Sequence, residues 1–433
     1  MKRQYPETAV FYRDLARLYE LAERAEGVWI HGADGRRWLD GCGGALAVSV
    51  GHGRRRVARA AARQLEAVGF VHGTQFTTRA MEEAAALLLE ALPAAYRDAK
   101  VYLTPGGTES VETAIKLARA VAVARGDGGR RLVLSQSPGY HGNTLGALAV
   151  SGRPALRGPY APMLPDARFV DAPWCPRCPL GLRWPECEVA CVAPAEEALA
   201  DEGATLAAVL VEPVLGASAG GFAPPEEYLR RVAAAARDAG VPLILDEVLS
   251  GCGRTGRFLA SEHAGVEADI VVLGKGLTSG YLPGGAVVAK PHVVDAAAPA
   301  FRHGFTFSHH PVVAAVVREV LRLFADEDLV RRAAGREPSL VRTLASIEAA
   351  SVVRSTWGRG LLGGIDLEPA DRGGVRASAL AAAAFEEGLL IYPTGGPPGQ
   401  GDVALLAPPL TIREEEMEEI GRRLRRAVAR VSR

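Results

Sequence analysis

Short apolar runs alternate with longer alanine-rich stretches through the middle of the chain. The alanine-rich stretches have helical spacing and cover residues 54–68, 79–92, 109–125 and 226–239. The apolar runs cover residues 100–103, 131–135, 207–211, 243–247, 270–273 and 285–289. Short apolar runs bounded by turn residues are typical of buried strands, and their alternation with helices is typical of a parallel sheet. The pattern therefore predicts an α/β fold built on a doubly wound, mostly parallel sheet.

The N-terminal part of the chain follows another pattern. Residues 1–26 have the spacing expected of an amphipathic helix. Two short strand-like runs follow, at 27–31 and 36–40, and the turn signal Ala33-Asp34-Gly35 lies between them. This arrangement predicts a β-hairpin.

From about residue 310 onward, helical stretches mix with a few strand-like runs, such as 363–367 and 389–392. We expect this C-terminal part and the N-terminus to form one smaller α+β domain, made of residues 1–50 and 310–433. Residues 51–309 then form the large domain. A chain of 433 residues that is 48% hydrophobic is long enough to bury a core of this size.

The charge balance excludes some classes of partner. Fifty acidic residues balance fifty basic ones, so the formal net charge is zero. A neutral chain lacks the positive surface that binds nucleic acids or anionic membranes, and small neutral or zwitterionic partners fit better. No apolar run approaches the length of a membrane span, and the N-terminus lacks the apolar core of a signal peptide. We therefore expect a cytoplasmic protein with no nucleic-acid or membrane partner.

Four of the six cysteines lie close together in the sequence, at Cys175, Cys178, Cys187 and Cys191. Two such pairs can bind zinc, form one or two local disulfides, or remain thiols in a proline-rich loop. The second pair departs from the usual spacing of a zinc knuckle, which favours thiols or disulfides. We expect this cluster to be structural and expect no metal in the active site.

One lysine ends a strand-like run, in a chain where lysine is scarce. The lysines are Lys2, Lys100, Lys116, Lys275 and Lys290. Lys275 stands between Gly274 and Gly276, directly after the run 270–273. Ligands of α/β sheets collect at the carboxyl ends of strands, and flanking glycines let a bound group come close. Since a desolvated lysine can lose its proton and attack a carbonyl, Lys275 is a candidate nucleophile; the alternative is a solvated strand-end lysine.

A glycine pair precedes the helix predicted at 109–125, in the run Thr104-Pro105-Gly106-Gly107-Thr108-Glu109. The backbone N–H groups of a first helical turn have no partner within the helix, and with the helix dipole they can bind a phosphate. Gly107 and Thr108 are the candidate ligands. The alternative is an ordinary helix start with Thr108 as N-cap.

The strand-like run 243–247 ends in carboxylates. A buried carboxylate is costly unless it is paired, so Asp246 needs a cationic partner. A protonated pyridine nitrogen is one such partner, and an arginine is another. Tyr140 follows the run 131–135 and supplies an aromatic ring that can stack on a planar ligand.

Residues 251–256 match the pattern G-x-G-x-x-G, which is typical of dinucleotide-binding enzymes. The context argues against that function. Five residues, 246–250, separate the preceding apolar run from the first glycine, and no acidic residue ends a following strand at the required distance.

A phosphate site, a strand-end carboxylate for a pyridinium and a strand-end lysine for an aldehyde are the three contacts that pyridoxal phosphate (PLP) requires. The chain resembles the class III aminotransferases of PLP fold type I. The segments that carry the resemblance are GGTESVETAIK (106–116), YHG (140–142), VEPV (211–214), LDEV (245–248), GRTG (253–256), LGKGL (273–277) and HGFTF (303–307). They follow the family's order and span nearly the whole chain. The resemblance implies PLP as cofactor, a large domain with a mostly parallel seven-stranded sheet, and a smaller α+β domain.

The resemblance also implies roles for single residues. Lys275 forms the covalent link to the cofactor and then acts as the proton-transfer base, while Asp246 keeps the pyridine nitrogen protonated. Tyr140 stacks on one face of the ring, and Val248 packs on the other. Further cofactor contacts are expected from His141, Glu212, Gly107, Thr108 and, across a subunit interface, Thr306. The implied assembly is a homodimer with shared active sites, or a dimer of such dimers.

Arg413 coincides with the arginine that binds a substrate carboxylate in the ω-aminotransferase and ornithine aminotransferase branches. Its segment predicts a helix start, with Thr411 as N-cap and Glu414 closing a capping box. An arginine in the first turn opposes the helix dipole, which favours a functional role. Its guanidinium can pair with a carboxylate, and Glu212 can hold it aside when an amine lacks that group. The alternative is a plain surface arginine.

Substrate choice is otherwise weakly marked. Gly44 and Phe76 fall where this family lines its substrate pocket, and the loop 175–191 resembles an insertion of an ω-amino acid:pyruvate-like subgroup. We expect an aminotransferase that moves an amino group from an ω-amino acid or amine to pyruvate or another 2-oxo acid by a ping-pong mechanism. The same family includes an aminomutase, amino acid racemases and a decarboxylase. A nicotinamide-dependent oxidoreductase is the alternative from a different class.

Overall fold

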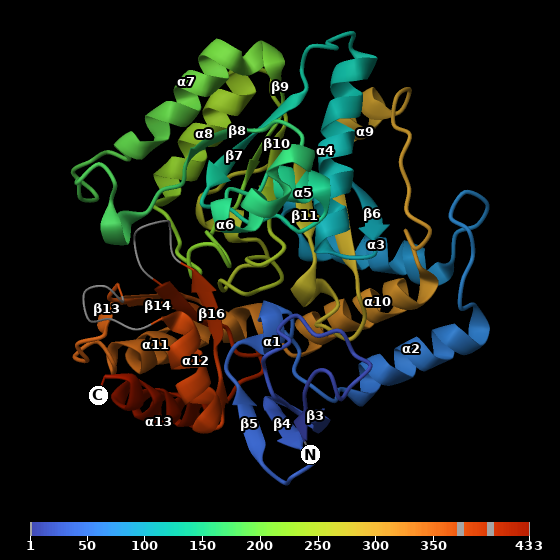
Figure 1. Cartoon of the computed structure of the whole chain (residues 1–433). Helices are drawn as coiled ribbons and strands as arrows, with labels where there is room; N and C mark the ends of the chain where they lie inside the picture. Colours follow the sequence, from blue (N-terminus) through green and yellow to red (C-terminus); the bar gives the residue numbers. More distant parts are fainter. Residues whose placement is uncertain (1, 370–375, 396–401, 433) are drawn as a thin grey trace.

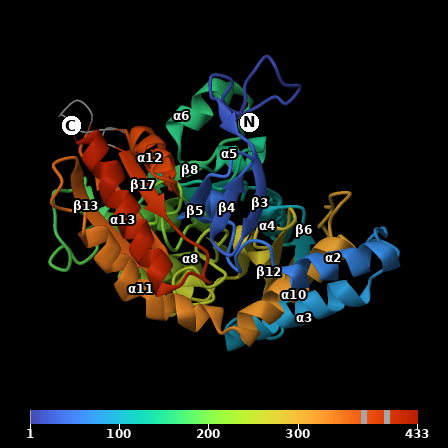
Figure 2. The ribbon, with the colours of Figure 1, turned by 90° about the horizontal axis from the view of Figure 1, so that it is seen from below.

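The computed structural model describes residues 2–369, 376–395 and 402–432. Figure 1 shows a large sheet with helices on both faces, and beside it a second group of elements from the two ends of the chain. The N-terminal strands (blue) and the C-terminal helices (orange to red) lie next to each other in this second group. Figure 2 shows the same grouping from below.

The large sheet has seven strands in the order β6-β12-β11-β10-β9-β7-β8. The strands are β6 (Lys100–Thr104), β7 (Leu132–Ser137), β8 (Arg168–Asp171), β9 (Leu206–Val211), β10 (Leu243–Asp246), β11 (Ile270–Leu273) and β12 (Gly285–Ala289). Neighbouring strands are parallel except at β12, which is antiparallel to both β6 and β11. The predicted α/β fold with a mostly parallel seven-stranded sheet is confirmed.

The strand ranges predicted from the sequence are confirmed, but the sequence pattern missed β8. This strand lies at the edge of the sheet, and Val170 is its one buried side chain. An edge strand with a single buried side chain leaves no apolar run in the sequence, so hydrophobic pattern alone does not reveal it.

The central strands direct alternate side chains to the two faces of the sheet. On β10, Leu243 and Leu245 share one core with α8 (Glu226–Asp238), whereas Ile244 shares another with α4 (Gly107–Ala124). Burial on both faces explains why these strands read as continuous apolar runs. The predicted helices are confirmed as α2 (Arg55–Ala67), α3 (Arg79–Ala91), α4 and α8.

The second group contains two smaller sheets. One has the order β15-β5-β4-β3 and joins the two ends of the chain, with β3 (Ala22–Glu26), β4 (Trp29–Gly32), β5 (Arg37–Asp40) and β15 (Leu389–Leu390). The other has the order β13-β14-β17-β16, with β13 (Val353–Arg359), β14 (Leu362–Leu367), β16 (Tyr392–Gly395) and β17 (Asp402–Leu406). The shared sheet supports the pairing of residues 1–50 with 310–433, whose boundaries stay a prediction.

The other described elements surround these sheets. They are β1 (Lys2–Arg3), β2 (Tyr19–Glu20), α1 (Gly43–Leu46), α5 (Leu145–Ala149), α6 (Pro154–Arg157), α7 (Ala193–Glu202), α9 (Pro291–Ala297), α10 (Pro311–Asp326), α11 (Leu329–Ala345), α12 (Ala377–Glu386) and α13 (Glu414–Val431). In Figure 2, α10 lies along α2 and α3, and it packs against both. No helix in the described parts of the chain is long and apolar enough to cross a membrane.

The N-terminal prediction was partly wrong. The hairpin is confirmed as β4 and β5, but residues 2–26 contain short strands and turns in place of a helix. Phe11, an apolar residue of the predicted helix, is 86% exposed in this chain. Backbone pairing with β4 instead makes residues 22–26 a strand.

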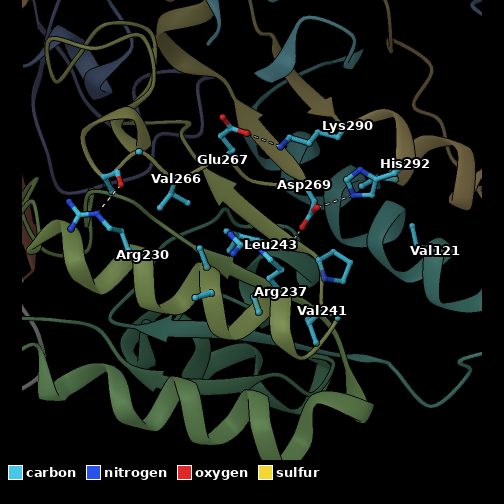
Figure 3. Close-up of a pocket in the computed structure, with 18 of the residues that line it drawn as sticks. Val121, Arg230, Arg237, Val241, Leu243, Val266, Glu267, Asp269, Lys290 and His292 are labelled. Atoms are coloured by element: carbon cyan, nitrogen blue, oxygen red, sulfur yellow. Dashed lines mark hydrogen bonds and ion pairs between the residues drawn. The ribbon is translucent and has the colours of Figure 1, made fainter. Parts of the chain in front are cut away.

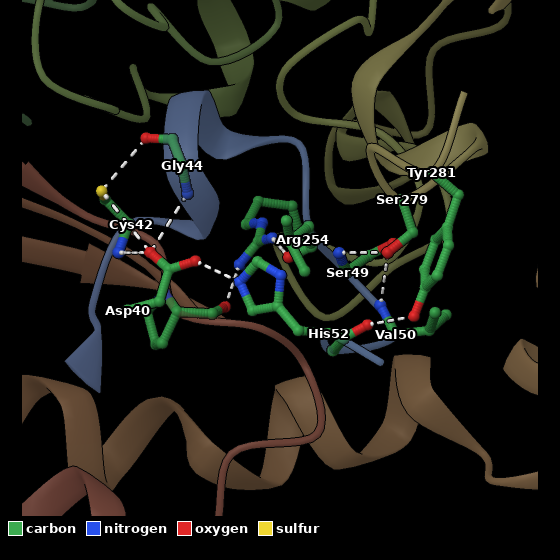
Figure 4. Close-up of polar contacts among 12 residues, drawn as sticks. Asp40, Cys42, Gly44, Ser49, Val50, His52, Arg254, Ser279 and Tyr281 are labelled. Atoms are coloured by element: carbon green, nitrogen blue, oxygen red, sulfur yellow. Dashed lines mark hydrogen bonds and ion pairs between the residues drawn. The ribbon is translucent and has the colours of Figure 1, made fainter. Parts of the chain in front are cut away.

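A buried polar network ties the N-terminal segment to the rest of the molecule (Figure 4). Asp40 is fully buried, lies 2.8 Å from His52 Nε2, and accepts hydrogen bonds from the N–H groups of Cys42 and Gly44. Arg254 is also buried and donates to the backbone oxygens of Val48, Leu361 and Pro408. Because a buried guanidinium is tolerated only with its donors bonded, Arg254 holds three chain segments together.

Candidate active site

The candidate site lies at the carboxyl ends of β10 and β11, beside the first turn of α4. A cavity of about 180 Å³ opens there, and we refer to it as the Lys275 cavity. Its lining residues are Gly107, Thr108, Tyr140, His141, Gly142, Glu212, Ala217, Asp246, Val248, Leu249 and Lys275. All the predicted cofactor-binding residues except Thr306 therefore come together in one place, although they are spread over most of the large domain's sequence.

The backbone around Lys275 is held in an unusual conformation. Lys275 follows β11 with a φ of 40°, in the left-handed region that non-glycine residues rarely adopt. Such a residue costs on the order of 1 kcal/mol and persists where its surroundings hold it. The extended Gly274 before it packs closely, because a Cβ there would lie 3.0 Å from the Cα of Gly107. This strained turn directs the Lys275 side chain into the cavity.

The ammonium group of Lys275 lacks a paired carboxylate. Its Nζ has no hydrogen bond or ion pair with any residue that the structure describes. Burial lowers the pKa of Lys275, and the charge of Arg254 lowers it further, against the raising effect of Asp246 and Glu212. A lysine with a lowered pKa loses its proton more readily and can then act as a nucleophile or a proton acceptor.

Asp246 ends β10 and is 5% exposed at the floor of the cavity. Its Oδ2 lies 2.7 Å from Nδ1 of His141, and its Oδ1 accepts a hydrogen bond from the N–H of Val248. Within the chain, this carboxylate pairs with a histidine and not with an arginine. Its expected role toward a cofactor nitrogen stays a prediction. Burial lowers the pKa of His141, but the hydrogen bond and charge of Asp246, with the charge of Glu212, raise it overall.

Glu212 is buried and shapes the wall of the cavity. Its carboxylate accepts hydrogen bonds from the N–H groups of Tyr140 and Gly216, each at 3.1 Å, and from the hydroxyl of Ser218. Burial raises the pKa of Glu212, and these N–H donors oppose the shift. Because its bonds hold Tyr140 in place, Glu212 positions an aromatic ring that lines the cavity.

The first turn of α4 forms the far wall. The helix begins at Gly107, and the backbone N–H groups of its first turn have no partner within the helix. A Cβ at Gly107 would lie 2.8 Å from Cγ1 of Val248, and a Cβ at Gly142 would lie 2.5 Å from Oγ1 of Thr108. The glycines therefore let the helix start, Val248 and the Tyr140 loop approach one another. This arrangement can bind a phosphate.

Three other predicted residues do not line the Lys275 cavity of this chain. Thr306 is exposed in the loop between α9 and α10. Phe76 is 61% exposed and lines a separate groove beside His309. Gly44, with φ of 65°, has open space where a Cβ would lie. Their predicted roles in cofactor or substrate binding stay predictions.

The helix start at Arg413 differs from the prediction. The N-cap of α13 is Arg413, and the carboxylate of Glu416 accepts from its backbone N–H at 2.9 Å. Glu414 instead binds Ser339, Arg336 and Arg342, because α11 lies alongside. The Arg413 side chain is 66% exposed and pairs with Glu416, while Glu212 has the other partners described above. Its role in carboxylate binding stays a prediction.

Sequence reasoning missed two lining residues and a nearby arginine. Ala217 and Leu249 line the cavity, and Arg153 donates a hydrogen bond to the backbone oxygen of Ala217 at 3.3 Å. Leu249 follows the quoted LDEV segment and could have been found there. Ala217 and Arg153 lie in loops whose local sequence carries no signal.

A second and larger cavity opens at the other end of the sheet, where β10 and β11 begin (Figure 3). This amino-end cavity has a volume of about 610 Å³. Lys290 pairs there with Glu267 at 3.2 Å, and His292 with Asp269 at 2.9 Å. With these acids and bases matched in pairs, the cavity offers no poised nucleophile, and size alone does not mark the reactive site.

The cysteine cluster and the G-x-G-x-x-G segment are the two other signals noted in the sequence. All six cysteines are free thiols, and the described residues contain no cluster of histidine, cysteine or acidic side chains that could hold a metal. The G-x-G-x-x-G segment lies in turns and does not begin a helix, and its Gly253 and Gly256 have φ of 80° and 82°. Its Arg254 belongs to the buried network of Figure 4. The dinucleotide alternative therefore has no structural support.

The chain matches the family model "Aminotransferase class-III" over residues 12–428, and it belongs to this PLP-dependent family. It is 31% identical over 423 residues to an omega-aminotransferase of Caulobacter vibrioides, covering 94% of this chain and 93% of the relative. It is 31% identical over 423 residues to a leucine/methionine racemase of Thermococcus litoralis, covering 95% and 91%. The solved structure of an (S)-enantioselective omega-transaminase from Thermomicrobium roseum superposes with a TM-score of 0.90 at 34% identity, covering 98% and 97%.

The residues of the Lys275 cavity fit this cofactor. The first turn of α4 can bind its phosphate, and the buried carboxylate of Asp246 complements a protonated ring nitrogen. Lys275, without a carboxylate partner, is available to its aldehyde. The protein is therefore a PLP-dependent class III aminotransferase of fold type I.

Proposed function

We propose that this enzyme moves an amino group from an ω-amino acid or simple amine to pyruvate or another small 2-oxo acid, by a ping-pong mechanism. The observation that carries the proposal is the desolvated, unpaired Lys275 close to a carboxylate held by His141. Similarity to an omega-aminotransferase and to an omega-transaminase supports this substrate class.

When bound, PLP supplies an electron sink that stabilises negative charge on the carbon next to the amino group. Lys275 Nζ, with its lowered pKa, can take a proton from that carbon and return it elsewhere. The buried carboxylate of Asp246 lines the cavity, and a carboxylate beside a ring nitrogen favours a proton there. Tyr140, whose backbone N–H is bound by Glu212, supplies an aromatic ring to the lining of the cavity.

The experiment is a pair of half-reactions on the PLP-loaded protein. An amine donor is added and the visible absorbance of the bound cofactor is followed; pyruvate is then added after the amine has been removed. We expect the visible band to disappear with the donor and return with pyruvate, with alanine as product. If no pair of amine and 2-oxo acid drives this cycle, the proposal fails.

Similarity to a leucine/methionine racemase supports one alternative on the same cofactor. A racemase inverts its amino acid and keeps the amino group on the same carbon skeleton. Incubation with one enantiomer of leucine, without any 2-oxo acid, separates the two functions. Appearance of the other enantiomer with no lasting change in the visible band would favour the racemase.

We also propose that the enzyme is a homodimer and that Thr306 contributes to the partner's active site. Support comes from aromatic side chains left exposed near Thr306: Phe307 is 57% exposed and Phe70 46%, with ring centroids 6.1 Å apart. Exposed aromatic clusters of this kind mark protein interfaces. Light scattering on the purified protein and on Phe307→Glu tests the dimer, and a monomeric wild-type protein would contradict it.

A further inference from the structure

Arg153 lies between α5 and α6, close to the Lys275 cavity but not in its lining. Its Nη1 donates a hydrogen bond to the backbone oxygen of Ala217, which lines the cavity. The Arg153 residue is of intermediate exposure, so the guanidinium is neither sealed in the core nor extended into solvent. A cationic group therefore lies next to a residue that lines the Lys275 cavity.

The loop that carries Arg153 is fixed to the large sheet. A Cβ at Gly152 would lie 2.2 Å from the backbone oxygen of Gln136, so the loop packs directly on β7. The N–H of Arg153 donates to the oxygen of Ser151 at 2.9 Å, and the hydroxyl of Ser151 accepts from the N–H of His141. The same loop thus contacts His141 and presents Arg153, which gives the guanidinium a defined position relative to Asp246.

The guanidinium of Arg153 has donors to spare. Its one hydrogen bond goes to a neutral carbonyl oxygen, and it forms no ion pair with any described residue. Arg177, by contrast, binds the carboxylate of Asp366 through two nitrogen atoms. An arginine with unused donors next to a cavity can pair with a carboxylate that enters the cavity.

Electrostatics also place Arg153 near the ring of Tyr140. Burial raises the pKa of the Tyr140 hydroxyl, Tyr392 raises it further, and the positive charges of Arg13 and Arg153 lower it. Tyr140 lines the cavity, so the field of Arg153 reaches the space that the substrate occupies. Arg13 is the other cation on this side, but it is exposed on the N-terminal segment.

Arg413 does not have these properties. Its side chain is two-thirds exposed and already pairs with Glu416 on its own helix at 2.8 Å. To bind a substrate carboxylate it would have to leave that partner, whereas Arg153 has none to leave. Because Lys275 lines the cavity and Arg153 contacts it only through Ala217, the arrangement suits a carboxylate separated from the reacting amine by several bonds.

Resting on the proposed function, we propose that Arg153, rather than Arg413, binds the remote carboxylate of an ω-amino acid donor. Arg153 is a specificity-determining residue in this proposal, because the amine chemistry itself needs only the groups around Lys275. The preferred donors are then amino acids whose carboxylate lies at the far end of a short aliphatic chain.

The test compares two donors that differ by one carboxylate, 4-aminobutyrate and butylamine, in the half-reaction of the PLP-loaded enzyme. Loss of a charge-assisted contact should raise the concentration of 4-aminobutyrate needed for half-maximal rate by about tenfold to a hundredfold in Arg153→Met. The value for butylamine should change by less than about twofold. Arg153→Lys should recover part of the loss, since it restores the charge without the planar fork.

Arg413→Met and Arg13→Met are the matched controls, and both should treat the two donors as the wild type does. Competitive inhibition by butyrate, which has the carboxylate but no amine, should weaken in Arg153→Met alone. An equal loss for both donors, no loss, or a selective loss in Arg413→Met or Arg13→Met would overturn the assignment. If the wild-type enzyme reacts with butylamine, the proposed aminotransferase function stands, and any of these results then counts against the role of Arg153 alone.

Discussion

The two ends of the large sheet carry cavities that differ in size and in chemistry. The amino-end cavity is the larger, at about 610 Å³ against about 180 Å³ for the Lys275 cavity. Yet Lys290 and His292 in the larger cavity form ion pairs with carboxylates, whereas Lys275 forms none with any residue that the structure describes. The comparison teaches that the reactive end is the one where burial leaves a functional group unmatched, and that volume is a poor guide to it.

Replacement of Lys275 or of Lys290 by alanine should give the largest contrast in transamination rate. Lys275→Ala removes the nucleophile and proton acceptor, so we expect transamination to fall by roughly a thousandfold or more, with folding intact. Lys290→Ala, at the other end of the sheet, should keep nearly full activity. Steady-state rates and circular dichroism spectra of both variants check this. Near-normal activity in Lys275→Ala would refute its role.

The second largest contrast in turnover is expected between variants of Asp246, at the end of β10, and Asp269, just before β11. Asp246→Asn keeps a hydrogen-bond acceptor for His141 but removes the buried charge, and we expect about a hundredfold loss of turnover. Asp269→Asn, in the amino-end cavity, should change turnover by less than about twofold. Turnover at saturating donor measures both. An unchanged rate in Asp246→Asn would mean that another group balances the cofactor nitrogen.

A smaller effect is expected at the helix start. In Gly107→Ala the new Cβ would meet Val248 at 2.8 Å, so the first turn of α4 should shift and PLP should bind about tenfold more weakly. Gly128→Ala is the control, because a Cβ there meets nothing within 4 Å. Fluorescence titration with PLP measures both affinities. Wild-type affinity in Gly107→Ala would show that this close approach does not shape the phosphate site.

The smallest effect concerns pH. The pKa of His141 is raised in the folded protein, so the folded state holds this proton more tightly than the unfolded state. The resulting stabilisation is present below the unfolded pKa of about 6.5 and is lost as pH rises through the folded pKa. His141→Gln should remove this part of the pH dependence of the free energy of unfolding. Urea titrations of the cofactor-free protein across that range measure it, and an unchanged profile would contradict the assignment.

A matched variant sharpens this comparison. His292→Gln breaks a histidine–aspartate pair at the amino end, where the side chain of His292 is 56% exposed. Because an exposed pair contributes little, the free energy of unfolding should change by less than about 1 kcal/mol. A larger change in the free energy of unfolding for His292→Gln than for His141→Gln would contradict the expectation that the histidine–aspartate pair at the carboxyl end contributes more.

The sequence predicted those parts of the site that stand at the ends of regular elements. Lys275 and Asp246 follow apolar runs, and Gly107 opens a helix, so local pattern places all three at one edge of the sheet. Arg153 and Ala217 were not predicted, because their contact joins two loops 64 residues apart. Contacts of that kind depend on packing of the whole domain and leave no local pattern.

The N-terminal segment shows the opposite failure. Helical spacing in residues 1–26 is a local signal, but pairing of residues 22–26 with β4 overrides it. The predicted start of α13 was wrong for a similar reason. Ser339 of α11 binds Glu414, and the N-cap is Arg413 in place of the predicted Thr411. In both cases a tertiary contact decides between local alternatives of similar energy.

Chemical trapping of the cofactor tests the contrast between the two ends most directly. The PLP-loaded protein is reduced with borohydride, digested, and the modified lysine is located by mass spectrometry. The chain has five lysines in all, Lys2, Lys100, Lys116, Lys275 and Lys290, so the assignment is unambiguous. We predict that the phosphopyridoxyl group is found on Lys275. Modification of Lys290 instead, or of no lysine, would contradict the placement of the active site at the carboxyl ends of β10 and β11.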